Sequence, residues 1–142
     1  MAYRIALVLK YLDEEYQAAV FRGAVHEAER LGIELVCIQS DFSDSLQFNS
    51  NFFPSDHKAF NFDGILFLSS ILLTSDSELI ANKLKDTFTS IPIVSIGTEL
   101  KNIPSTICEA DTAINQLISH LIDNHGYKRF LYLGGPVENK DS

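Results

Sequence analysis

Residues 3–40 read YRIALVLKYLDEEYQAAVFRGAVHEAERLGIELVCIQS, and this stretch decides the fold. It begins with an uninterrupted apolar run at 3–10 and closes with a second one at 33–40. Between the two runs, apolar residues recur at spacings of three and four, which is the period of an amphipathic helix. Strands that are apolar throughout are typical of a parallel sheet whose two faces are covered by helices. The stretch therefore predicts a strand, a helix and a second, parallel strand.

The same alternation continues along the chain. Apolar runs at 63–70, 92–97 and 104–110 predict three further strands, and apolar stripes at 75–88 and 111–125 predict two further helices. Connections between parallel strands are right-handed, which makes a doubly wound sheet the simplest arrangement. We expect an α/β fold with three layers, α/β/α, and a Rossmann-like parallel sheet in the strand order 2-1-3-4-5.

Two segments do not fit this alternation. Residues 41–62 are rich in phenylalanine but show no sustained period, and we expect a short helix around 44–53 followed by a loop. The apolar run at 130–133 predicts a strand for which the first five strands leave no obvious place. Because its backbone groups need partners, we expect it to add to an edge of the sheet or to exchange with a second chain.

Composition excludes several classes of partner. The chain has 142 residues and a net charge of −8, from 19 acidic and 11 basic residues. This charge argues against binding to nucleic acid and to anionic membrane surfaces. No apolar run is long enough to cross a bilayer, and the N-terminus has no cleavage site of an export signal, so the cytoplasm is the expected compartment.

The two cysteines predict neither a disulfide framework nor a zinc site. Cys37 and Cys108 lie in apolar runs and lack the CxxC spacing. The predicted strand order places them at opposite edges of the sheet, too far apart to bond. We expect two buried free thiols.

Motifs of the common enzymes on such sheets are missing. The segment after the first strand, KYLDEEY, has no glycine for a dinucleotide, and the chain contains no P-loop. No GxSxG elbow surrounds Ser69 or Ser70, and His120 and His125 are five residues apart rather than the four that align two metal ligands on a helix. We expect no catalytic residue, no metal and no cofactor. A small flavodoxin-like enzyme with unrecognised reactive residues is a remote alternative.

Polar and aromatic side chains gather where the predicted strands end, which is where doubly wound sheets bind ligands. Carboxylates and hydroxyls around an aromatic face suit a small polar ligand such as a sugar or a nucleoside. Each of these residues can also have a purely structural role. The acids can form a solvated helix turn, the aromatic ring can belong to the core, and the aspartate can cap a helix. The candidate ligand-binding residues are Asp13, Glu14, Tyr16, Ser69, Ser70, Thr98 and Asp111.

Two stretches resemble a known family. Residues 13–40 and 91–142, the latter containing GYKRFLYLGGP at 126–136, resemble the LacI/GalR-type, periplasmic-binding-protein-like ligand domains. The likeness is greatest to the sensor branch that precedes histidine kinase or diguanylate cyclase modules. The resemblance implies a cleft between two lobes, with residues 1–125 as the first lobe and 126–142 as a crossover and the first strand of a truncated second lobe.

The resemblance also implies site residues and a function. Tyr16 matches the family's ligand-facing aromatic residue and Asp111 its aspartate before the helix, whereas Thr112 stands where an asparagine is common. The implied function is a non-catalytic small-molecule sensor of a cytosolic bacterial signalling or transcription-regulatory protein, acting by lobe closure and rearrangement of a homodimer. The alternative is a dimerisation or protein-docking domain that has lost its ligand.

Overall fold

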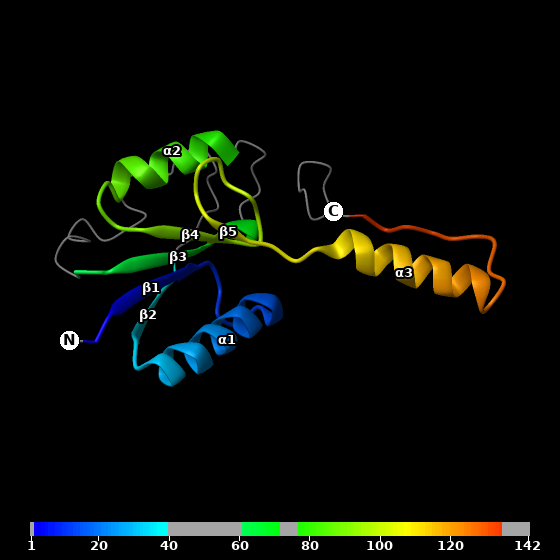
Figure 1. The fold of residues 1–142 in the computed structure, drawn as a ribbon, viewed down its shortest axis with the longest axis horizontal. Helices are drawn as coiled ribbons and strands as arrows, with labels where there is room; N and C mark the ends of the chain where they lie inside the picture. Colours follow the sequence, from blue (N-terminus) through cyan, green and yellow to red (C-terminus); the bar gives the residue numbers. More distant parts are fainter. Residues whose placement is uncertain (1, 40–60, 72–76, 135–142) are drawn as a thin grey trace.

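The computed structural model of the chain describes residues 2–39, 61–71 and 77–134 (Figure 1). The helix expected around 44–53 lies outside these residues. Every other expected element appears except the strand at 130–133, and most bounds agree within two residues. The strands are β1 (Arg4–Leu9), β2 (Glu34–Gln39), β3 (Gly64–Leu68), β4 (Ile93–Ile96) and β5 (Ser105–Thr106). The helices are α1 (Glu15–Leu31), α2 (Ser77–Thr87) and α3 (Ala110–Asp123), and a 3₁₀ turn, η2 (Ser69–Ile71), follows β3.

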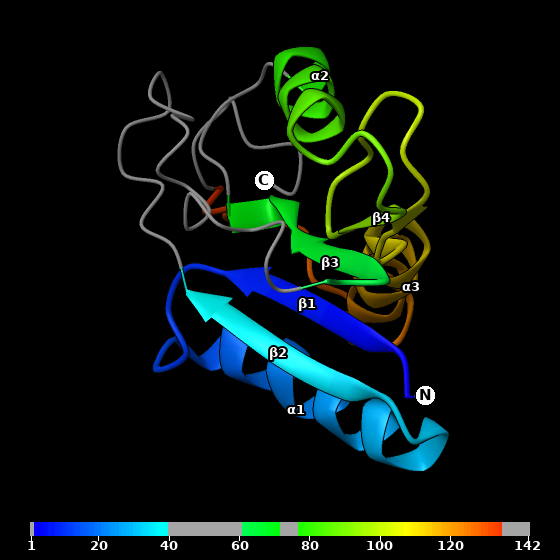
Figure 2. The ribbon, with the colours of Figure 1, turned by 90° about the vertical axis from the view of Figure 1, so that its left-hand side faces the viewer.

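The five strands form one parallel sheet in the order β2-β1-β3-β4-β5, as the sequence predicted. Strand β1 is an interior strand, in which Ile5 pairs with Leu35 of β2 on one side and with Gly64 of β3 on the other. Helix α1 covers one face of the sheet and α2 covers the other (Figure 2). The inner strands β1 and β3 read as continuous apolar runs because both of their faces are covered.

Alternate residues of β1 enter two separate cores. Ala6 and Val8 belong to a cluster beneath α2 that also contains Phe67. Leu7 and Leu9 belong to a second cluster, against which α1 packs. The two-residue period of the strand thus places one set of side chains under each helix.

Helix α3 does not cover the sheet. It extends away from the other elements (Figure 1), and none of its residues is buried. Ile114 and Leu117, on the apolar stripe expected to face a core, are 54% and 52% exposed. The amphipathic pattern of α3 therefore has no partner among the described residues.

Residues 127–134 follow α3 without forming a strand. Leu131 and Leu133 are 86% and 85% exposed. The prediction that 130–133 adds to an edge of this sheet is wrong, because the edge strands are β2 and β5. Exchange with a second chain stays a prediction.

Both cysteines are free and lie toward opposite edges of the sheet, Cys37 in β2 and Cys108 just after β5. Cys37 is half-buried, and its burial raises the pKa of the thiol. Cys108 is exposed, so the expectation of a buried thiol is wrong there, because the chain is leaving the sheet at this residue. Among the residues that the structure describes, no helix has both the length and the apolar character of a membrane span.

Candidate functional site

Three residues meet at the carboxyl edge of the sheet, where β1, β3 and β4 end side by side. Tyr16 lies in the first turn of α1, Ser70 in η2 after β3, and Gly97 directly after β4. The hydroxyl oxygens of Tyr16 and Ser70 are 3.2 Å apart and share a hydrogen bond. The two chain connections after β1 and β3 are therefore joined by side chains at this edge. We call Tyr16, Ser70 and Gly97 the carboxyl-edge cluster.

Gly97 is required by the close approach of the other two residues. A β-carbon built on Gly97 would lie 2.5 Å from both Cβ and Oγ of Ser70 and 3.3 Å from Oη of Tyr16. Its φ of +92° is also a conformation that residues with a side chain rarely adopt. Backbone and hydroxyls can thus approach at this point only because residue 97 has no side chain.

Tyr16 is not a core residue. Its side chain is 47% exposed although it follows the helical spacing of the apolar residues in α1. An aromatic ring that is half open to solvent, with its hydroxyl held by Ser70, can pack on the C–H surface of a ligand. The structural alternative for Tyr16, burial in the core, is therefore wrong.

Ser69 belongs to a buried network and not to the exposed edge. Its side chain is 2% exposed, and its Oγ lies 2.6 Å from Oγ of Ser95 and accepts from the backbone N–H of Thr98 at 3.1 Å. Ser95 in turn donates to the carbonyl of Thr98 at 2.6 Å. These hydroxyls hold the turn after β4, which also places Gly97. Ser95 is not among the residues predicted from the sequence; the signal for it is a polar residue inside the apolar run of β4.

The connection between β1 and α1 is fixed by a buried glutamine. The side-chain oxygen of Gln17, which is 4% exposed, accepts from the backbone N–H groups of Lys10 at 2.7 Å and Tyr11 at 2.9 Å. Glu14 is the N-cap of α1 and accepts from the N–H of Gln17 at 3.2 Å. Gln17, which was not predicted from the sequence, therefore positions the turn that presents Tyr16. The only sequence signal for the burial of Gln17 is the alternation of polar and apolar residues around it.

The remaining predicted residues surround the cluster or lie away from it. Asp13 is exposed in the same loop as Glu14, whose carboxylate is partly used by the cap. Thr98 contributes backbone groups to the serine network and is half-buried. Asp111 is the second residue of α3 and is exposed; the N-cap position belongs to Glu109, so the expected capping role is wrong. Because α3 leaves the sheet (Figure 1), Asp111 is not joined to the carboxyl-edge cluster by any described contact.

The chemistry available at this edge is recognition by hydrogen bonds and stacking. The hydroxyls of Tyr16 and Ser70 can each donate and accept, and the exposed carboxylates of Asp13 and Glu14 accept only. Carboxylates near the cluster disfavour an anionic ligand. Within the described ranges, no group of three or more histidine, cysteine, aspartate or glutamate side chains is placed to hold a metal ion. The arrangement suits a neutral or cationic polar molecule.

No protein-family profile and no curated protein matches the sequence. Solved structures do match. The trehalose repressor from Escherichia coli superposes with a TM-score of 0.72 at 18% identity, over 99% of this chain and 50% of the repressor. The transcription regulator CcpA of Lactococcus lactis gives 0.65 at 23% identity, over 87% of this chain and 43% of CcpA. GanP, a glucose-galactose binding protein from Geobacillus stearothermophilus, gives a TM-score of 0.60 at 23% identity, over 89% of this chain and 44% of GanP.

The chain spans about half the length of each of these proteins. Two of them are repressors or regulators of transcription and one is a sugar-binding protein. The comparisons confirm the predicted fold, a Rossmann-like α/β half domain built on a parallel sheet.

Proposed function

We propose that this chain contains the first lobe of a LacI/GalR-type sensor domain that binds a small polar molecule between two lobes. The observation that carries the proposal is the carboxyl-edge cluster, in which Tyr16 and Ser70 present hydroxyls 3.2 Å apart at the switch-point edge of the sheet. The half-exposed ring of Tyr16 supplies the stacking face. A sugar or a nucleoside, with hydroxyls and a C–H surface, fits these groups, and the regulators and the sugar-binding protein of similar fold support this class.

The proposed boundary between the lobes lies before α3. The sequence placed it at residue 125, with 126–142 as the crossover. The exposed stripe of α3 and the exposed apolar residues of 131–133 favour a boundary between β5 and α3 instead. In the whole protein, α3 and the segment after it would then pack together in the core of the second lobe.

The proposed mechanism is lobe closure. A ligand that contacts both lobes stabilises the closed arrangement by its differential affinity for it, and closure shifts the packing of a homodimer. An output module, of the histidine kinase or diguanylate cyclase type that the sequence resemblance implies, would respond to this shift in the cytoplasm. In this proposal the chain itself is not an enzyme.

The alternative is a dimerisation or protein-docking domain without a ligand. The observation that favours it is the exposed apolar surface of α3, formed by Ile114, Leu117 and Ile122. Surfaces of this kind mark sites of contact with other chains.

A thermal-shift screen on the natural protein, extended to include both lobes, separates the two functions. Sugars, nucleosides and amino acids are tested singly, and a ligand at one hundred times its Kd should add about 2.7 kcal/mol of stability. The shift should shrink when Tyr16 is replaced by phenylalanine and persist when the neighbouring Tyr11 is. A screen without any stabiliser, together with a dimer that depends on protein concentration, would establish the docking function instead.

A further inference from the structure

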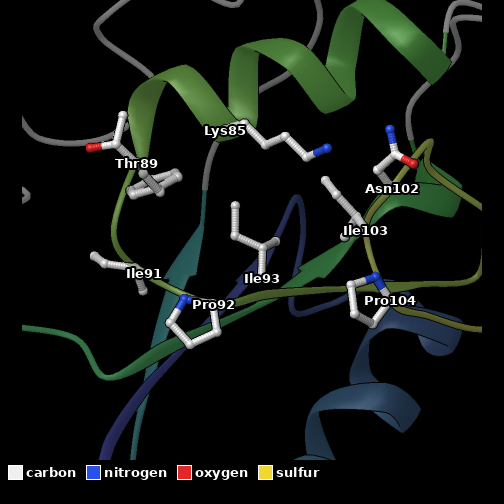
Figure 3. A pocket seen from close by; sticks show the side chains of 9 residues that line it. Lys85, Thr89, Ile91, Pro92, Ile93, Asn102, Ile103 and Pro104 are labelled. Carbon is white, nitrogen blue, oxygen red and sulfur yellow. The ribbon is translucent and has the colours of Figure 1, made fainter.

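A cavity of about 270 Å³ lies between the end of α2 and the strands β4 and β5 (Figure 3). It lies at the opposite end of the strands from the carboxyl-edge cluster. Pro92 and Pro104 line it and directly precede β4 and β5, so the cavity opens beside the amino ends of these strands. The end of α2 forms its other wall. The lining residues are Lys85, Phe88, Thr89, Ile91, Pro92, Ile93, Asn102, Ile103 and Pro104.

The inner surface of the cavity is apolar. Phe88, Ile93 and Ile103 are buried and extend the core beneath α2 to the cavity wall. Pro92 and Pro104 bring no backbone N–H group to the lining. A guest inside the cavity therefore meets hydrocarbon and gains most by burying an apolar group.

The mouth of the cavity carries a cation that has no carboxylate partner within the part of the chain that the structure describes. Lys85 lies in the last turn of α2, and its ammonium reaches across the mouth on the side of Asn102 (Figure 3). Its Nζ donates to the carbonyl of Lys101 at 3.3 Å, which occupies one of three donors. Among the described residues Lys85 forms no ion pair, whereas Lys101 next to it is paired with Glu78 at 2.6 Å.

The ammonium of Lys85 is not the only hydrogen-bond donor at the mouth. The side-chain amide of Asn102, which also lines the cavity, offers further donors beside it. Asn102 has a φ of +57°, so the loop before β5 holds this residue in a conformation that few residues with a side chain adopt. The mouth thus combines one ammonium and one amide above an apolar floor.

We propose that this cavity binds a small monocarboxylate with an apolar tail. The tail lies against Phe88, Ile93 and Ile103, and the carboxylate accepts hydrogen bonds from the ammonium of Lys85 and the amide of Asn102. Charge-assisted hydrogen bonds of this kind are about twice as strong as neutral ones, so the charge of the head group decides the specificity. The proposal is independent of the ligand at the carboxyl-edge cluster.

Hexanoate, hexanol and hexylammonium test the proposal on the 142-residue chain, because they share a tail and differ in the charge of the head group. Each is titrated against chain labelled at the isoleucine δ1 methyls, and shifts are followed by NMR. Hexanoate should shift the methyls of Ile91, Ile93 and Ile103 and bind at least about fivefold more tightly than hexanol, with hexylammonium weakest. Equal binding of hexanoate and hexanol, or shifts confined to other methyls, would overturn the proposal.

Three variants locate the interaction. Lys85→Met keeps the length of the stem and should abolish the preference for hexanoate over hexanol, whereas Lys83→Met, on the same helix but outside the cavity, should keep it. Ile91→Phe should block binding of all three compounds. If Lys85→Met still prefers hexanoate over hexanol, the proposal is refuted. It is also refuted if the methyl signals of Ile91, Ile93 and Ile103 shift with protein concentration alone, because a second chain would then fill the cavity. The comparison of hexanoate with hexanol on the natural sequence tests the proposal even if a variant does not fold.

Discussion

Tyr16 and Ser70 are 54 residues apart in the sequence, yet their hydroxyl oxygens lie 3.2 Å apart. The bond joins the first turn of α1 to the turn after β3, across the ends of two neighbouring strands. Because both groups are open to solvent, the bond contributes little to folding. Its larger effect is to fix the direction of the tyrosine ring at the edge where a ligand is proposed to bind.

Removing either hydroxyl should therefore have a small effect on stability, and the effects of the two removals should not add. Tyr16→Phe and Ser70→Ala should each lower the free energy of unfolding by about 0.5–1 kcal/mol, and the double variant by no more than the larger single effect. Urea unfolding of the four proteins gives the coupling, and Tyr11→Phe, at an exposed tyrosine of the loop between β1 and α1, should change nothing. Strictly additive effects would show that the bond is not formed in solution.

Gly97 should tolerate no side chain. Gly97→Ala places a β-carbon 2.5 Å from Ser70 at a φ of +92°, and we expect a loss of about 1–3 kcal/mol in the free energy of unfolding. Gly23→Ala is the matched control, since nothing lies within 4 Å of its added β-carbon inside α1, and should stabilise the chain by about 0.5–1 kcal/mol. Chemical denaturation measures both. A Gly97→Ala chain as stable as the natural one would contradict the geometry of the cluster.

Ser95 should matter more to stability than its exposed counterparts. Ser95→Ala removes the donor to the carbonyl of Thr98 and a partner of Ser69 inside the protein, which should destabilise the chain by about 1–3 kcal/mol. Ser119→Ala, on the exposed surface of α3, should have no measurable effect. Thermal unfolding of the two variants decides the point. Equal stabilities would mean that water satisfies the network as well as Ser95 does.

The fold was predictable because it follows from local periods. Runs such as 3–10 fix the strands, the helical stripe of α1 fixes a crossover, and the right-handed rule then leaves one simple strand order. The apolar stripe of α3 was equally visible, but a period shows only that a helix has a face to bury. It does not show which surface covers that face, and so the lobe to which α3 belongs does not follow from its period.

The sequence predicts which side chains meet at the site only where the end of a strand alone fixes the position of the residue that follows it. Tyr16 and Ser70 follow β1 and β3 and therefore meet. Ser69, one residue earlier, turns inward to Ser95, and this direction depends on a partner 26 residues away. Gln17 is buried for a similar reason, since its oxygen satisfies backbone groups of a loop whose shape no propensity describes.

The thiol of Cys37 should make stability depend on pH under alkaline conditions. Burial raises its pKa, so the folded chain holds the proton more tightly than the unfolded chain does. This contribution is complete below the unfolded pKa, about 8.5, and is lost as the pH rises through the folded pKa. Relative to Cys37→Ala, the natural chain should therefore lose stability above about pH 8.5 in urea titrations from pH 7 to 10. Cys108→Ala, at an exposed thiol, is the control, and a difference between Cys37→Ala and the natural chain that does not vary with pH would contradict the burial of Cys37.

The lobe boundary can be tested through Leu117. In the 142-residue chain its side chain is 52% exposed, so Leu117→Ala should change the free energy of unfolding by less than about 0.5 kcal/mol. In the protein extended to both lobes, the same substitution should cost about 2–5 kcal/mol, because α3 is then proposed to be buried. Leu84→Ala, at a fully buried position of α2, should be destabilising in both proteins. If Leu117→Ala were harmless in the extended protein as well, α3 would not belong to the core of the second lobe, and its apolar stripe would instead be left for contact with another chain.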